Sequence, residues 1–203
     1  MDFRAVLFDM DGVLMHSFEA WLSLMNAAAK HFGRPPISRD SFRAVYGQPT
    51  SADVEMYFPT QTEEEVEAYY DAHFHEHASA SEVSPEAAPV MEALKERGLG
   101  VAVITNTPSS LAKQMLDAAS LEPDVLIGGS DVPNAKPAPD IIFRACELLG
   151  VEPWDVLVVG DSRYDKQAAA AAASPFAGIG GLGGNFTIQD LQQVLDIVDG
   201  NAV

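Results

Sequence analysis

The 203-residue sequence predicts an α/β fold, a doubly wound parallel sheet with an inserted α-helical cap domain. Short apolar runs of strand length alternate with helical patterns after residue 84, which is the order typical of a parallel sheet covered by helices. One further apolar run lies near the N-terminus, and the segment between these two regions carries helical patterns only. We therefore expect a core of residues 1–15 and 84–203 and a cap of residues 16–83.

The expected core strands are apolar runs that end in polar or turn-forming residues. They cover residues 4–9, 101–106, 124–128, 156–160 and 176–179. Apolar residues at helical spacing predict core helices over 85–97, 109–120, 137–149, 164–173 and 187–198. Gly98 and Gly150 are good terminators for two of these helices, and Thr187 is a good N-cap for the last.

The expected cap helices follow one another with short turns between them. They cover residues 19–32, 38–46 and 62–77, and turns at 33–36 and 47–50 separate them. Two short connections, near residues 15–17 and 80–84, join this segment to the core. We expect them to act as hinges, so that closure of the cap excludes water from a site beneath it.

Composition excludes several classes of protein. The chain has 47% hydrophobic residues and 30 acidic against 12 basic residues, a formal net charge of -18. Nucleic acids and anionic membranes need basic patches, so neither is an expected partner. No apolar stretch approaches the ~20 residues of a transmembrane helix, and we expect a soluble, cytoplasmic protein with an acidic, solubility-favouring surface. A saline habitat is the alternative explanation of the charge.

Asp9 and Asp11 carry the most specific chemical signal. They end the apolar run of residues 5–8, and side chains two residues apart along an extended strand share a face. Two carboxylates that close repel each other unless a cation lies between them. An acidic turn ended by Gly12 is the alternative interpretation of this segment alone.

Three later segments place polar residues where further strands end. Residues 101–108 end in hydroxyl and amide side chains at Thr105 and Asn106, Lys136 lies among prolines at a helix start, and residues 156–160 precede Asp161 and Asp165. Taken singly, Thr105 or Asp161 could cap a helix and Lys136 could be a surface charge. In a doubly wound sheet, however, ligands bind beyond the carboxyl ends of the strands, where these residues fall.

In this order and spacing, the four segments resemble the signature motifs of the haloacid dehalogenase-like hydrolase superfamily. The resemblance covers nearly the whole chain, implies a Rossmann-like core, and is strongest to the phosphoglycolate phosphatase-like and β-phosphoglucomutase-like branch. It implies that Asp9 is a nucleophile that forms an aspartyl-phosphate, and that Asp11 is the general acid and base. It also implies Mg²⁺ held by Asp9, by the backbone carbonyl of Asp11 and by Asp161, with Asp165 in support.

The same resemblance implies the groups that bind the substrate's phosphate. Thr105 and the backbone N–H of Asn106 would hold phosphate oxygens, and Lys136 would supply a fixed positive charge. The turn at residues 47–51 would face the active site from the cap, which makes Gln48 a candidate substrate-binding residue.

Two residues depart from the pattern of these relatives. His16 stands where an Asp is usual at the start of the cap, either as an ordinary hinge residue or as a substrate contact. Ala173 stands where a helix-ending Gly is usual, at a cost of about 1 kcal/mol if the backbone there has positive φ.

The resemblance leaves more than one function open. The leading interpretation is a phosphatase for a small phosphorylated metabolite of the phosphoglycolate or sugar-phosphate type. A phosphomutase has the same core, but mutases place an arginine close to the position of Thr50, and none is present here. A catalytically silent binding module is disfavoured because no core acid is missing. The oligomeric state, monomer or weak dimer, is not predicted.

Overall fold

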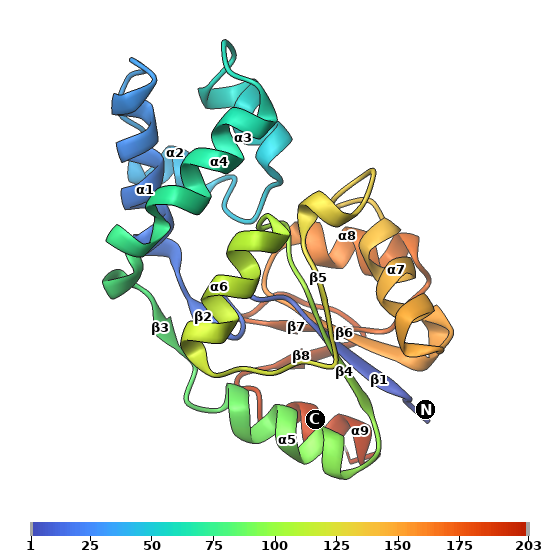
Figure 1. Cartoon of the computed structure of the whole chain (residues 1–203). Helices are drawn as coiled ribbons and strands as arrows, with labels where there is room; N and C mark the ends of the chain where they lie inside the picture. The colour runs from blue at the N-terminus through green and yellow to red at the C-terminus, as the bar shows by residue number, and fades with distance from the viewer. Residues whose placement is uncertain (1, 202–203) are drawn as a thin grey trace.

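The computed structural model describes residues 2–201 and contains a six-stranded parallel sheet (Figure 1). The strands lie in the order β5-β4-β1-β6-β7-β8, so the first strand of the chain is central. Their bounds are β1 Ala5–Phe8, β4 Gly100–Ile104, β5 Val125–Ile127, β6 Val156–Gly160, β7 Phe176–Ile179 and β8 Phe186–Ile188. The predicted α/β class with a doubly wound parallel sheet is confirmed.

Helices cover both faces of this sheet, which explains its apolar strands. The residues of β1 and β6 are buried throughout, as expected for a parallel sheet covered on two sides. Helices α5 (Ala87–Glu96), α6 (Ser109–Ala119) and α9 (Gln193–Val198) pack on one face, and α7 (Asp140–Leu149) and α8 (Arg163–Ala171) pack on the other. Alternate residues of β1 divide between the two faces: Val6 and Phe8 contact the first set, and Ala5 and Leu7 the second.

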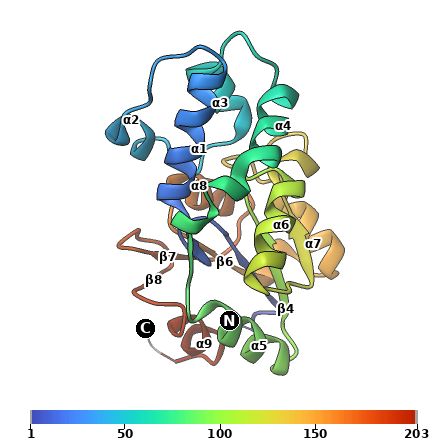
Figure 2. The same ribbon diagram turned by 60° about the vertical axis from the view of Figure 1, so that its left-hand side comes forward.

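The segment between β2 (Met15–His16) and β3 (Glu82–Val83) contains helices only. They are α1 Phe18–His31, α2 Arg39–Arg43, α3 Thr50–Tyr57 and α4 Glu63–His73, followed by the short 3-10 helices η1 Phe74–Glu76 and η2 Ala78–Ala80. Figures 1 and 2 show α1–α4 grouped together, to one side of the sheet. β2 and β3 pair antiparallel, so the two connections between this helical segment and the sheet lie side by side.

The structure corrects the predicted C-terminal helix. Residues 186–188 form strand β8, in which Thr187 pairs with Gly178 of β7, and the helix begins only at Gln193. Thr187 is therefore a strand residue and not an N-cap. The preceding helix ends at Ala171, and Ala173 has a φ of +57°, the left-handed conformation that glycine would favour.

The cap prediction also needs correction. Helix α3 lies in a segment for which only a turn at 47–50 was expected, and α2 is shorter than the predicted helix at 38–46.

Two further 3-10 helices, η3 Gly129–Asp131 and η4 Pro153–Asp155, lie between the elements of the sheet. Within residues 2–201, no helix combines the length and the apolar character that crossing a bilayer requires.

Candidate active site

Asp9 and Asp11 lie directly beyond the carboxyl end of the central strand β1. Both are buried, and the backbone N–H of Asp9 still donates to the carbonyl of Val159 on β6, at 2.8 Å. Gly12 follows with a φ of +92°, which turns the chain sharply away from the sheet. The sheet thus fixes the backbone of Asp9, and Asp11 immediately precedes the turn.

Lys136 is a buried cation between two carboxylates, with only 2% of its surface exposed. Its ammonium lies 2.8 Å from Oδ1 of Asp9, 2.6 Å from Oδ1 of Asp165 and 3.0 Å from the carbonyl oxygen of Ile104. Burial lowers the pKa of Lys136, but Asp165 and Asp9 outweigh this effect and raise the pKa above its ordinary value. Lys136 is therefore charged at neutral pH, and all three of its donors have acceptors.

Asp165 is held in place by the start of helix α8. Its Oδ2 accepts from the backbone N–H of Ser162 at 3.1 Å and from the hydroxyl of Ser162 at 2.5 Å, in a reciprocal capping box. Since Lys136 occupies Oδ1, both carboxylate oxygens of Asp165 have partners within the protein. Asp165 is thus a rigid support for Lys136.

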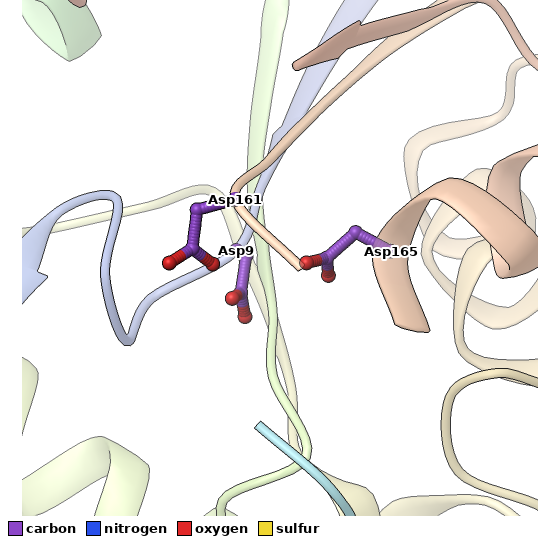
Figure 3. A group of neighbouring side chains, drawn as sticks. All are labelled: Asp9, Asp161 and Asp165. Carbon is purple, nitrogen blue, oxygen red and sulfur yellow. The ribbon is translucent and has the colours of Figure 1, made fainter. Parts of the chain in front are cut away.

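Asp9, Asp161 and Asp165 form an acidic cluster (Figure 3). One oxygen from each lies within 4.8 Å of the others. Burial raises the pKa of Asp9 well above its usual range, and Asp165 raises it further, although Lys136 opposes the shift. Burial likewise raises the pKa of Asp161 to about 7. Lys136 pairs with Asp9 and Asp165, so the three carboxylates of the cluster outnumber its one ammonium. The cluster offers only oxygen ligands, which suits a hard divalent cation such as Mg²⁺.

The carboxylate of Asp11 is held by hydroxyl and indole donors. Oδ1 accepts from Nε1 of Trp21 at 2.8 Å and from the hydroxyl of Ser17, and Oδ2 accepts from the hydroxyl of Thr107 at 2.7 Å. The hydroxyl of Thr105 lies 3.4 Å from Oδ2. Thr107, Ser17 and Trp21 were missed as site residues.

Asn106 joins three segments through its side chain. Its amide nitrogen donates to the carbonyl oxygens of Gly47 and Lys136, each at 2.9 Å, and its carbonyl oxygen accepts from the backbone N–H of Lys136 at 2.8 Å. The prediction assigned only the backbone N–H of Asn106. The side chain holds the lysine loop to the strand end and contacts the helical segment at Gly47.

A pocket lies between these strand ends and the helical segment. Its walls include acids, aromatic rings and hydroxyl or amide groups: Asp9, Asp11, Trp21, Phe42, Tyr46, Gln48, Thr50, Asp53, Tyr70, Thr105, Asn106 and Thr107. The predicted Gln48 is among them, and its amide donates to Oδ1 of Asp53 at 2.7 Å. His16 lies outside this pocket, in a neighbouring hollow that also contains Asp161 and Arg43.

The fold is that of a doubly wound α/β protein, a class that binds ligands beyond the carboxyl ends of its central strands, and the clustered carboxylates lie at those ends. The chain belongs to the haloacid dehalogenase-like hydrolase family, whose model matches residues 6–179. The predicted family and the hydrolase class are confirmed.

Relatives and solved structures agree with this assignment. The chain is 33% identical over 185 residues to phosphoglycolate phosphatase 1 of Pseudomonas aeruginosa, in a match that covers 83% of this chain and 66% of that protein. It is 29% identical to the phosphoglycolate phosphatase of Aquifex aeolicus, over 86% of this chain and 83% of that one. A haloacid dehalogenase-superfamily hydrolase of Geobacter sulfurreducens has 27% identity and a TM-score of 0.72, over 97% of both chains.

Proposed function

We propose that the chain is a Mg²⁺-dependent phosphatase that hydrolyses a small phosphate monoester, of the phosphoglycolate or sugar-phosphate type, through a phosphorylated Asp9. The observation that carries this proposal is the placement of Asp9, which lies in the pocket with one oxygen on the buried ammonium of Lys136 and with Asp11 beside it. The phosphatase names of the relatives support the reaction class.

Asp9 is suited to be the nucleophile because its two oxygens have different environments. Oδ1 accepts from Lys136, while Oδ2 has no hydrogen bond from any of residues 2–201. Attack by Oδ2 on phosphorus forms the Asp9 O–P bond as the bond from phosphorus to the leaving alcohol breaks. The buried lysine fixes the carboxylate so that little reorganisation precedes attack.

Asp11 is suited to move the proton. It protonates the leaving alcohol oxygen in the first step, and in the second it removes a proton from the water that attacks phosphorus and releases Asp9. The donors from Thr107 and Trp21 hold its carboxylate at a fixed angle beside the pocket.

The remaining predicted residues bind the phosphate and the cation. Thr105 and the backbone N–H of Asn106 would hold phosphate oxygens, and Lys136, whose three donors are already engaged, would supply a fixed positive charge. Asp9, the carbonyl of Asp11 and Asp161 would hold Mg²⁺, whose charge offsets that of the phosphate and of the acidic cluster. Asp165 supports this set through Lys136.

Residues 16–83 would act as a cap that closes over the pocket and chooses the leaving group. The hydrogen bond between Asn106 and the carbonyl of Gly47 supports a closed arrangement, and the paired connections β2 and β3 would be the hinges. A phosphomutase is the alternative function. It is disfavoured because a mutase must hold a second phosphate during reorientation. None of the described residues that line the pocket is a lysine or an arginine that could do so.

The proposal is tested by phosphate release from a panel of small phosphate monoesters, with Mg²⁺ and with EDTA. We expect phosphate and dephosphorylated product in equal amounts, no requirement for a bisphosphate activator, and loss of activity in EDTA that Mg²⁺ restores. Full activity in EDTA would refute the metal assignment. Isomerisation of a sugar phosphate without phosphate release would establish the mutase instead.

A further inference from the structure

Asp53 is a buried carboxylate in the helical segment that faces the same pocket as the candidate nucleophile. It lies on helix α3 and is 8% exposed. Gln48 donates to Oδ1 at 2.7 Å and the hydroxyl of Tyr70 donates to Oδ2 at 3.2 Å. An ionised carboxylate accepts about four hydrogen bonds, so Asp53 retains acceptor capacity toward the pocket.

The charge of this pocket is entirely acidic. Asp9, Asp11 and Asp53 line it with carboxyl groups. Among the described residues that line the pocket, none is Lys or Arg. Lys136 lies beneath Asp9, where it is fully engaged by Asp9, Asp165 and a backbone carbonyl. The phosphate end of a substrate thus has a buried cation, whereas the leaving-group end has a buried anion.

Two of the three arginines of the helical segment, Arg39 and Arg43, lie in the hollow beside the pocket but do not reverse its charge. Arg39 forms an ion pair with Glu19, and Arg43 lies over the ring of Phe18, at 5.1 Å from its centroid. Both line the neighbouring hollow that contains His16, on the other side of Tyr46. An anionic group on the leaving alcohol would meet Asp53 in the pocket and would find these cations only outside it.

We propose that Asp53, held by Gln48 and Tyr70, is a specificity-determining residue that selects phosphate monoesters whose leaving group carries hydroxyl or ammonium donors, and that discriminates against leaving groups carrying a carboxylate. This inference rests on the proposed phosphatase activity and chooses between its two substrate types. A hydroxyl or ammonium on the leaving group donates a charge-assisted hydrogen bond to Asp53, whereas a carboxylate meets like charge at low dielectric. Polyol or amino-alcohol phosphates are therefore favoured over phosphoglycolate.

Three nearly isosteric esters isolate this charge effect: phosphoglycolate, ethylene glycol monophosphate and phosphoethanolamine. Their leaving groups are of similar size and carry a negative charge, no charge and a positive charge. Burial raises the pKa of Asp53 to about 7, so kcat/KM is measured at about pH 8.5, where the carboxylate is ionised. We expect phosphoethanolamine and ethylene glycol monophosphate to exceed phosphoglycolate by about tenfold or more, the ratio that ~1.4 kcal/mol produces.

Asp53→Asn should reduce this preference, because it removes the charge and keeps the shape. The ratio of ethylene glycol monophosphate to phosphoglycolate should fall toward 1, with kcat/KM for phosphoglycolate rising. Glu55→Gln removes the same charge from an exposed position on the same helix and should leave the ratio as in the wild type. The order of the three substrates in the wild type tests the proposal without any variant.

The outcomes separate this inference from the proposed function. Turnover of none of the three esters, nor of other phosphate monoesters, would contradict the phosphatase itself. A wild-type preference for phosphoglycolate, or an unchanged ratio in Asp53→Asn, would overturn the role of Asp53 while leaving the phosphatase standing. If the wild type did prefer phosphoglycolate, and Arg43→Ala lost that preference, the carboxylate of the leaving group would instead bind in the neighbouring hollow, and the role of Asp53 would be overturned.

Discussion

Gly12 lies so close to Asp161 that a β-carbon on Gly12 would be 2.1 Å from Oδ2 of that carboxylate. Gly12 also has a φ of +92°, a conformation that L side chains rarely adopt. A side chain at position 12 would therefore strain the turn and would also clash with Asp161, a candidate metal ligand.

Gly12→Ala should impair the site more than the fold. The added methyl group must displace Asp161, and a displacement of about 1 Å in an active site costs roughly 100-fold in rate. We expect a comparable loss of kcat/KM and a higher Mg²⁺ requirement in a phosphate-release assay. Gly33→Ala is the matched control, because Gly33 has a φ of +65° but no atom near its β-carbon position. It should lose about 1 kcal/mol of stability and keep its activity; equal activity losses in the two variants would refute the role of Gly12.

Lys136→Met should be strongly destabilising as well as inactive. It leaves Asp9 and Asp165 buried without their cation, and removing one partner of a buried ion pair costs about 3–5 kcal/mol. Urea unfolding in EDTA measures this change in the free energy of unfolding. Adding Asp165→Asn should restore part of the stability but none of the activity. Lys113→Met, which breaks an exposed ion pair with Asp117, should change stability little.

Ala173→Gly should stabilise the protein. Ala173 has a φ of +57° after helix α8, and glycine relieves that strain at a gain of about 1 kcal/mol. Ala170→Gly, within the same helix, should instead lose about 1 kcal/mol. Thermal unfolding of the two variants distinguishes the effects, and a lower midpoint for Ala173→Gly would contradict the assigned conformation.

The core of the fold is predictable from sequence because its strands are buried on both faces. Residues 156–160 and 176–179 match β6 and β7 to the residue, since continuous apolar runs bounded by polar residues leave little choice. β8 was missed because three residues after a glycine-rich loop carry too little pattern, and Thr187 offers an equally good helix start. Strands β2 and β3 have two residues each, too few for any periodicity.

The strand pattern by itself predicts the parts of the candidate site that follow strands directly, whereas Lys136 and Gln48 were assigned to the site through the family resemblance. Asp9, Thr105 and Asp161 come to the same edge of the sheet because parallel strands end together there. The contacts of Asp11 with Trp21 and Ser17 depend on how the helical segment lies against the sheet, which local patterns do not determine. Asp53 was missed because a buried acid in a polar helix has the same sequence signature as a surface acid.

Asp53 should make stability fall as pH rises. Burial raises the pKa of this carboxyl from 3.8 to about 7, so the folded state binds its proton more tightly than the unfolded state does. The stabilisation is complete below about pH 4 and is lost as pH rises to about 7, a difference of up to ~4 kcal/mol. Tyr70 stays protonated throughout, since burial and Asp53 keep its pKa well above the ordinary value.

Asp53→Asn should therefore become more stable relative to the wild type between about pH 4 and pH 7. Urea unfolding at a series of pH values measures the difference between the two proteins. The exposed Glu55→Gln variant should show no such trend. A constant difference across this range would mean that Asp53 has an ordinary pKa.

The central claim, that Asp9 carries the phosphoryl group during turnover, is tested most directly by trapping the intermediate. The protein is mixed with its best substrate and Mg²⁺, quenched in acid during the first turnover, reduced with borohydride, and digested for mass spectrometry. We predict that residue 9 alone is converted to homoserine, the product of reducing an aspartyl-phosphate, and that Asp9→Asn shows neither this product nor phosphate release. Trapping at another residue, or release of phosphate by Asp9→Asn at the wild-type rate, would contradict the account.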